Sequence, residues 1–114
     1  STYLKALNGY LELTGREFEV FVELCKLQAQ YLSLNYSHEQ ISNLIFGPSS
    51  RKLIRTHLSI SPYNLNNVLK SLRTKHLVLI TEDKQYYLNP QIFVNDNEVE
   101  YSVNYKFTLN KEIN

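Results

Sequence analysis

Apolar positions recur along this chain with two different periods. Between residues 15 and 75, several stretches place apolar side chains every three or four positions, which is the spacing of one helix face. Residues 99–109 alternate instead, with an apolar side chain at every odd position, which is typical of a strand with one buried face. The pattern predicts an α+β fold whose helices precede most of its strands.

A capping box predicts where the long first helix begins. The Thr14 hydroxyl and the Glu17 carboxylate can each accept a hydrogen bond from a backbone N–H group of the first turn. The apolar face that follows consists of Phe18, Phe21, Val22, Cys25, Ala29 and Leu32. Cys25 lies in this stripe without an activating partner at helical spacing, so we interpret it as a core residue rather than a nucleophile.

Two short helices are predicted next. Ser37 is placed to cap the first, together with Gln40, and Gly47-Pro48 ends it after about Phe46. Ser49 or Ser50 is expected to cap the second. Its inward-facing residues are expected to be Leu53, Ile54 and Leu58.

The most strongly marked helix follows the turn at residues 59–61. Ser61 can cap it, and Pro62 occupies the first position, where a missing N–H group removes no hydrogen bond. Its buried stripe, which runs to about Lys75, consists of Leu65, Val68, Leu69 and Leu72. Residues 77–90 then predict a hairpin of two short strands around the polar turn 82–85.

Both ends of the chain predict further strands. In residues 1–13, Asn8-Gly9 between apolar runs indicates a hairpin, and a single strand followed by a turn is the alternative. Residues 95–114 predict an acidic linker and a strand, which must pair with the hairpin, with the N-terminal strand or with a second chain. A homodimer contact would involve Tyr101, Val103, Tyr105 and Phe107, although burial within a sheet is the competing interpretation.

Composition narrows the class of protein. The 114 residues suit a single domain, with a core expected over residues 14–94. No stretch approaches the ~20 apolar residues that span a bilayer, and no signal peptide is recognisable. One cysteine and three scattered histidines predict neither a disulfide nor a metal site. We therefore expect a cytoplasmic protein that has no cofactor and no contact with membranes.

Catalytic patterns are missing from the sequence. His38, His57 and His76 fall on separate predicted elements, and no carboxylate pair, glycine-rich phosphate loop or nucleophile motif accompanies them. The chain is not expected to be an enzyme, and no small-molecule substrate is evident.

Charge is unevenly distributed, although the formal net charge is only +1. No Asp or Glu stands between Gln40 and Thr81, whereas this window holds six of the twelve basic residues: Arg51, Lys52, Arg55, Lys70, Arg73 and Lys75. Phosphates respond to a local basic patch rather than to net charge, so this window favours a nucleic-acid partner. Chance variation of surface charge is the alternative.

The predicted order of helix, three-residue turn, helix and hairpin resembles a winged helix-turn-helix. The segment "RKLIRTHLSISPYNLNNVLKSLRTKHLVLI" is similar to a common prokaryotic and phage pattern at Leu58, Ile60, Ser61, Leu65, Leu69, Leu72, Lys75 and Leu77. "YYLNPQIF" resembles a motif of plasmid RepL-type replication initiators and small phage-encoded winged-helix proteins. The likeness covers about Tyr3 to Phe93 and implies three main helices, a hairpin wing and a short N-terminal strand, whereas the predicted C-terminal strand lies outside it.

Two residues depart from that pattern. Ser59 and His76 occupy positions where the family carries glycine, because the backbone there often has a positive φ angle. The resemblance thus predicts a left-handed backbone at both residues.

The resemblance implies that the helix at 62–75 enters the DNA major groove. Base contacts are expected from Tyr63, Asn64, Asn66 and Asn67, since an asparagine amide can pair with adenine. Phosphate contacts are expected from Arg51, Lys52, Arg55, Ser61, Lys70, Arg73, Lys75 and Lys84. The asparagines could instead reflect the Asn-rich composition of the whole chain.

The expected function is double-stranded DNA binding in transcription regulation or replication initiation by a phage or mobile-element protein. The alternative is a winged-helix module for protein contacts, such as a phage assembly or host-takeover factor. The uncharged tip of the 62–75 helix and the near-zero net charge favour this alternative.

Overall fold

The computed structural model describes residues 2–95, 98–101 and 106–108, which form an α+β fold as predicted. The helices are α1 (Thr2–Leu11), α2 (Gly15–Ser33), α3 (His38–Ile45), α4 (Pro48–Leu58) and α5 (Pro62–Thr74). An antiparallel pair joins β1 (Val78–Ile80) to β2 (Tyr86–Leu88). A second antiparallel sheet has the order β3 (Ile92–Asn95), β4 (Glu98–Tyr101), β5 (Lys106–Thr108).

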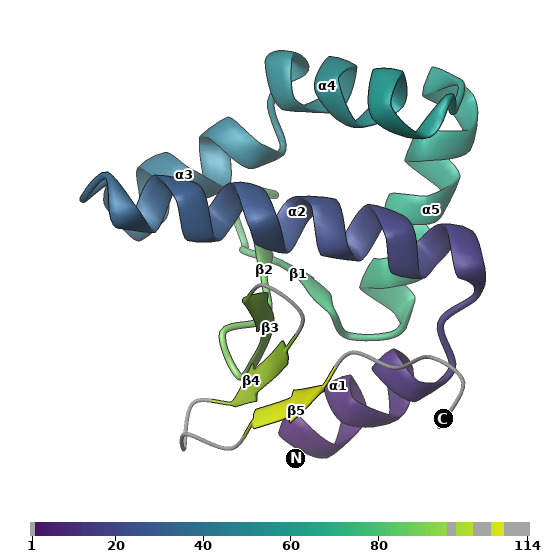
Figure 1. The fold of residues 1–114 in the computed structure, drawn as a ribbon, viewed down its shortest axis with the longest axis vertical. Coiled ribbons are helices and arrows are strands. Elements are labelled where there is room, and N and C mark those ends of the chain that lie inside the picture. The colour runs from purple at the N-terminus through teal and green to yellow at the C-terminus, as the bar shows by residue number, and fades with distance from the viewer. Residues whose placement is uncertain (1, 96–97, 102–105, 109–114) are drawn as a thin grey trace.

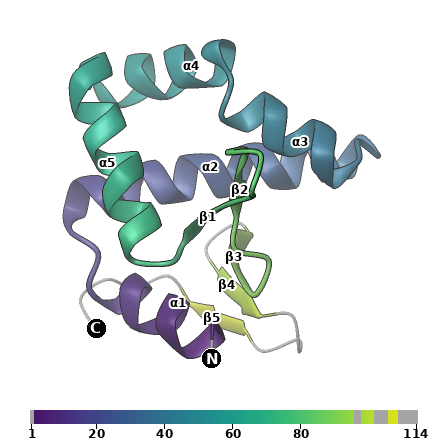
Figure 2. The same ribbon diagram turned by 180° about the vertical axis from the view of Figure 1, so that it is seen from behind.

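Helix α2 is the element around which the others pack. It crosses the middle of the molecule and contacts α3, α4, α5 and β3 (Figure 1). Helix α4 lies on one side of it, whereas α1 and the β3–β5 sheet lie on the other side, as both views show (Figures 1 and 2). None of the helices within the described ranges is long and apolar enough to span a bilayer.

The buried face of α2 differs from the predicted stripe. Phe21 and Cys25 are buried as expected, but Val20 and Leu24 are buried too, while Leu32 at the far end is exposed. A helix with neighbours on several sides buries a wider arc than a stripe of one face, which is why the single-face prediction was incomplete.

The predicted helix starts are confirmed in three cases. Complete capping boxes begin α2 at Thr14 and α3 at Ser37, and the Ser61 hydroxyl accepts from the backbone N–H of Asn64 at the start of α5. The prediction for α4 was wrong, because Gly47 is its N-cap and Pro48 its first residue.

Two further details of α4 differ from the prediction. Ser50 is buried inside the first turn, whereas Leu53, expected to face inward, is 43% exposed. Ile54 is buried and Leu58 packs against the core as predicted. The earlier start of the helix explains why neither Ser49 nor Ser50 can cap it.

Both predicted left-handed positions are confirmed. Ser59, at the end of α4, has φ 52°, and His76, after α5, has φ 65°. The turn at His76 is fixed by the buried side chain of Asn89, whose amide nitrogen donates to the His76 carbonyl at 2.9 Å. This turn directs the chain from α5 into the β1–β2 hairpin, which also forms as predicted around residues 82–85.

The N-terminal hairpin was predicted wrongly, because residues 2–11 form helix α1. Ala6, Tyr10 and Leu13 are buried at spacings of four and three, so the apolar positions follow a helical period rather than an alternating one. Gly9 is needed for a close approach and not for a turn: a Cβ atom at this position would overlap the backbone carbonyl of Lys75.

The C-terminal prediction was also partly wrong. Strands β4 and β5 pair antiparallel, so residues 99–109 cannot be one continuous strand. β4 pairs with β3 in a register that places Val94 opposite Val99. β3 therefore extends to Asn95, the residue at which the acidic linker was predicted to begin. Tyr101 belongs to β4 and Phe107 to β5, whereas Val103 and Tyr105 lie outside the described residues.

The approach of α1 to the end of α5 gives a stability prediction. Gly9→Ala should lower the free energy of unfolding by about 2 kcal/mol, because the new methyl group must push α1 away from the Lys75 carbonyl. Gly15→Ala is the matched control, since a Cβ at Gly15 meets no atom within 4 Å. Urea unfolding of both variants checks this, and equal losses in the two would contradict the close approach.

Candidate nucleic-acid interface

Helix α5 is held at one end of the molecule by elements on both sides. A turn at residues 59–61 joins it to α4, and its C-terminal end leads directly into β1, which packs against it (Figure 2). The hairpin is in turn held to α3 through a hydrogen bond from the Gln85 amide to Asn43. Leu65 and Leu72 bury one side of α5 in the core, so the opposite side is presented outward.

Three of the residues predicted to contact DNA lie on the outward face of α5. Tyr63, Asn67 and Lys70 follow one another at spacings of four and three, all three are exposed, and Tyr63 is 73% exposed. This face therefore offers an aromatic ring, an amide and an ammonium group within two helical turns.

A hollow of about 230 Å³ lies beside that face, between α5 and the β1–β2 hairpin. Its polar rim consists of Arg51, Asn66, Lys70 and Arg73, and its apolar lining consists of Phe46, Leu69, Val78 and Tyr86. None of the described residues that line it is acidic. The rings of Phe46 and Tyr86 lie 5.8 Å apart and come from elements that the sequence does not place together.

Arg51 is fixed at the edge of this hollow. Its Nε donates to the Phe46 carbonyl at 2.9 Å, and its Nη1 donates to Asn66 Oδ1 at 2.7 Å. The guanidinium group thereby links α4 to α5 and the end of α3. The sequence predicted a phosphate contact for Arg51 and a base contact for Asn66, and only the tertiary structure brings the two side chains together.

Other predicted contact residues lie apart from this cluster. Asn64 is exposed, but it lies on another flank of α5. Ser71, two turns further along that same flank, forms a hydrogen bond with Glu17, so this flank is the one that faces the start of α2. Lys52 is exposed on α4, and Arg55 is half-buried one turn after Arg51. The Ser61 hydroxyl accepts from Asn64 N at 3.1 Å as the helix cap.

Lys84 lies in the turn between β1 and β2, not on α4 or α5. It has φ 63° and is exposed, next to the exposed acids Glu82 and Asp83. The turn thus carries two acidic side chains and one basic side chain, which reduces its attraction for phosphate.

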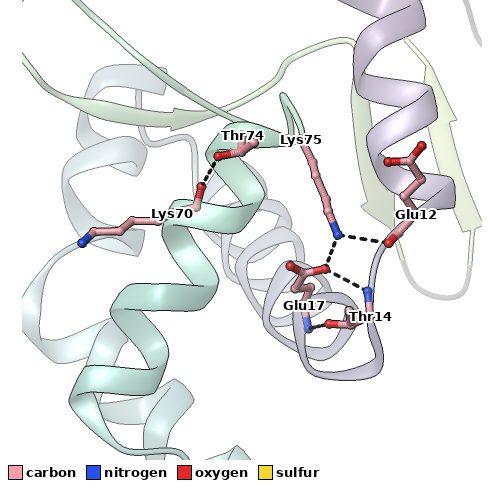
Figure 3. Close-up of polar contacts among 6 residues, drawn as sticks. All are labelled: Glu12, Thr14, Glu17, Lys70, Thr74 and Lys75. Atoms are coloured by element: carbon pink, nitrogen blue, oxygen red, sulfur yellow. Dashed lines mark hydrogen bonds and ion pairs between the residues drawn. The ribbon is translucent and has the colours of Figure 1, made fainter.

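Lys75 is turned inward, unlike Lys70. Its ammonium group lies 2.6 Å from Glu17 Oε1 and 3.0 Å from the Glu12 carbonyl oxygen, whereas Lys70 points away from this cluster (Figure 3). Glu17 is also the N3 residue of the α2 capping box and accepts from the Thr14 backbone N–H at 2.8 Å. Lys75 therefore joins the end of α5 to the start of α2 and is already engaged within the chain.

The Glu17 carboxyl has a perturbed pKa. Burial alone would raise it, but hydrogen bonds from Lys75, the Thr14 backbone and Ser71, with the charge of Lys75, outweigh burial and hold the pKa below its usual value. The carboxylate form of Glu17 is accordingly part of the folded structure at neutral pH.

The histidines and the single cysteine form no common site. His57 Nδ1 lies 2.8 Å from Glu23 Oε1 on α2, His38 is exposed at the start of α3, and His76 occupies the left-handed turn. Cys25 is buried in the core, as predicted. Within the part of the chain that the structure describes, no three His, Cys, Asp or Glu side chains group as a metal site would require.

Comparison of this chain with protein-family models, curated proteins and solved structures found no match. The assignment of a function therefore depends on the residues and geometry of the chain itself.

The Lys75–Glu17 contact predicts an acid-dependent stability. Glu17→Gln keeps the reciprocal cap but removes the charge, so at pH 7 it should lower the free energy of unfolding by about 1–2 kcal/mol. Because the folded pKa is below the unfolded one, this difference should exist above about pH 4.3 and vanish as pH falls through the folded pKa.

Urea unfolding of wild type and variant across pH 2–7 measures that difference. Glu12→Gln is the matched control, because Glu12 contributes only its backbone carbonyl to Lys75 and its side chain is exposed. A difference that did not change with pH would contradict a stabilising charge at Glu17.

Proposed function

We propose that this chain is a non-catalytic, winged-helix type DNA-binding protein whose recognition helix is α5. The observation that carries the proposal is the outward face of α5, where Tyr63, Asn67 and Lys70 are exposed together beside the acid-free hollow. A helix of this kind can enter the major groove, where an amide reads base edges and basic side chains neutralise phosphates.

The arrangement of charge supports this proposal. Lys70 and Arg73 on α5 and Arg51 on α4 flank the outward face. The described acids nearest to them in sequence are Glu39 on α3 and Glu82 in the hairpin turn. In the proposal the protein grips the backbone through α4 and α5, while the acidic hairpin turn contributes little. Lys75 is left out of the set of phosphate contacts.

From the resemblance to phage and plasmid proteins, we propose a role in transcription regulation or replication initiation in a host cytoplasm. A homodimer through the C-terminal strands stays a prediction. In this proposal, an edge strand of the second sheet, β3 or β5, makes the contact, because β4 is already flanked on both sides.

Selection of bound duplexes from a random pool tests the proposal directly. We expect retardation in a mobility shift at low salt and an enriched sequence in the bound fraction. Asn67→Ala should broaden the selected sequences, because one amide that reads a base is lost. The preference for the correct base at that position should fall by about 1–3 kcal/mol. Absence of any retardation at low salt would overturn the proposal.

A pair of lysine variants tests which side of α5 faces DNA. Lys70→Ala should weaken binding to all duplexes alike and lower the slope of log affinity against log salt by about 1. Lys75→Gln should leave that slope unchanged at a temperature where circular dichroism shows the variant folded, because its ammonium group is engaged with Glu17. Equal changes of slope in the two variants would contradict this orientation.

A second candidate function is contact with a protein partner. The exposed apolar side chains Leu32, Leu34 and Tyr36 gather where α2 ends, and Leu34 is 59% exposed. This patch lies at the end of α2 away from α5 (Figure 1). The two candidates predict opposite results in the mobility shift, and substitutions at Leu34 should leave duplex binding unchanged if the first is right.

A further inference from the structure

We infer that the hollow between α5 and the β1–β2 hairpin binds a single phosphate group, and that Asn66 is one of its donors rather than a reader of adenine. The inference rests on the proposed function for the source of that phosphate, which is a DNA backbone.

Arg51 has a fixed position beside the hollow. Two hydrogen bonds, to the Phe46 carbonyl and to Asn66 Oδ1, hold the planar guanidinium group at the rim. Its remaining N–H groups are not used by these two bonds, so a preorganised cation with free donors stands at the hollow.

The contact with Arg51 also fixes the orientation of the Asn66 amide. A guanidinium group can only donate, so the atom of Asn66 that faces Arg51 must be the oxygen. The amide nitrogen of Asn66 is then left with two hydrogens to donate. Adenine requires an acceptor and a donor from the same amide, whereas a phosphate oxygen requires donors only.

The charge around the hollow is positive. Lys70 and Arg73 add two cations to that of Arg51, and no acidic side chain is among the described lining residues. The apolar lining, which includes Phe46 and Tyr86, excludes water from one side and strengthens the attraction for an anion. A volume of about 230 Å³ is roughly eight times the ~30 Å³ that one water takes up in the liquid, so the hollow has room for a phosphate group.

These properties fit a phosphate from either of two sources, a DNA backbone or a free phosphate ester. Both present the same oxygens to the same donors. The experiment therefore uses inorganic phosphate as the probe and a duplex as its competitor.

The test is a titration of the full chain with inorganic phosphate at constant ionic strength, followed by ¹H–¹⁵N NMR. Saturable shifts are expected at the Arg51 Nε–H and the Asn66 side-chain amide. Asn66→Asp should reduce phosphate affinity at least tenfold, because a repelling carboxylate replaces the donor while the contact with Arg51 is kept.

Asn67→Asp is the matched control, since it adds the same charge one residue along α5, on the outward face away from the rim. It should reduce phosphate affinity less than threefold. If phosphate causes no saturable shift, or if both variants lose the same affinity, the inference is wrong whether or not the protein binds DNA.

The duplex arm separates this inference from the proposed function. If the protein binds a duplex in the mobility shift and that duplex displaces the bound phosphate, the site is assigned to a DNA backbone. If inorganic phosphate binds and Asn66→Asp abolishes that binding, but the protein shifts no duplex, the site is supported for a free phosphate ester. The proposed function is then overturned. A duplex that binds without displacing phosphate overturns the DNA backbone as the source.

Discussion

The contact between Lys75 and Glu17 connects three parts of the molecule that are distant in sequence. The ammonium group at the end of α5 reaches the N3 carboxylate of α2 and the carbonyl of Glu12 after α1, so one side chain joins the ends of three helices. Gly9 lets α1 approach the Lys75 backbone directly beside this contact. Together with the packing of α5 on α2, α4 and β1, this junction holds the helix from which Tyr63 and Lys70 project.

That junction also divides the basic residues of α5 into two groups. Lys75 satisfies a buried carboxylate, whereas Lys70 and Arg73, on another flank of the helix, border the hollow beside the hairpin. A charge count over the sequence treats these three basic residues alike. Their surroundings assign one to stability and the other two to the surface that we propose for DNA.

Much of the fold could be predicted from local patterns. Capping boxes at Thr14 and Ser37 and the Ser61-Pro62 start were readable because each requires residues within one helical turn. The left-handed turns at Ser59 and His76 were predicted from the resemblance and confirmed. Predictions failed where a long-range contact decided the outcome, as at Gly9, whose small size serves helix packing, and at β4, which pairs with β3 rather than continuing into β5.

For the candidate site, the sequence by itself determined which residue types stand on the exposed face of the 62–74 helix, because the apolar stripe fixes the opposite face. It also determined the acid-free window around that helix. Only the tertiary structure decided that Lys75 turns inward, that Arg51 holds the oxygen of Asn66, and that Phe46 and Tyr86 line a common hollow. The physical reason is that helical periodicity acts within a few residues, whereas hydrogen bonds and ion pairs form between any groups that the fold brings within about 3 Å.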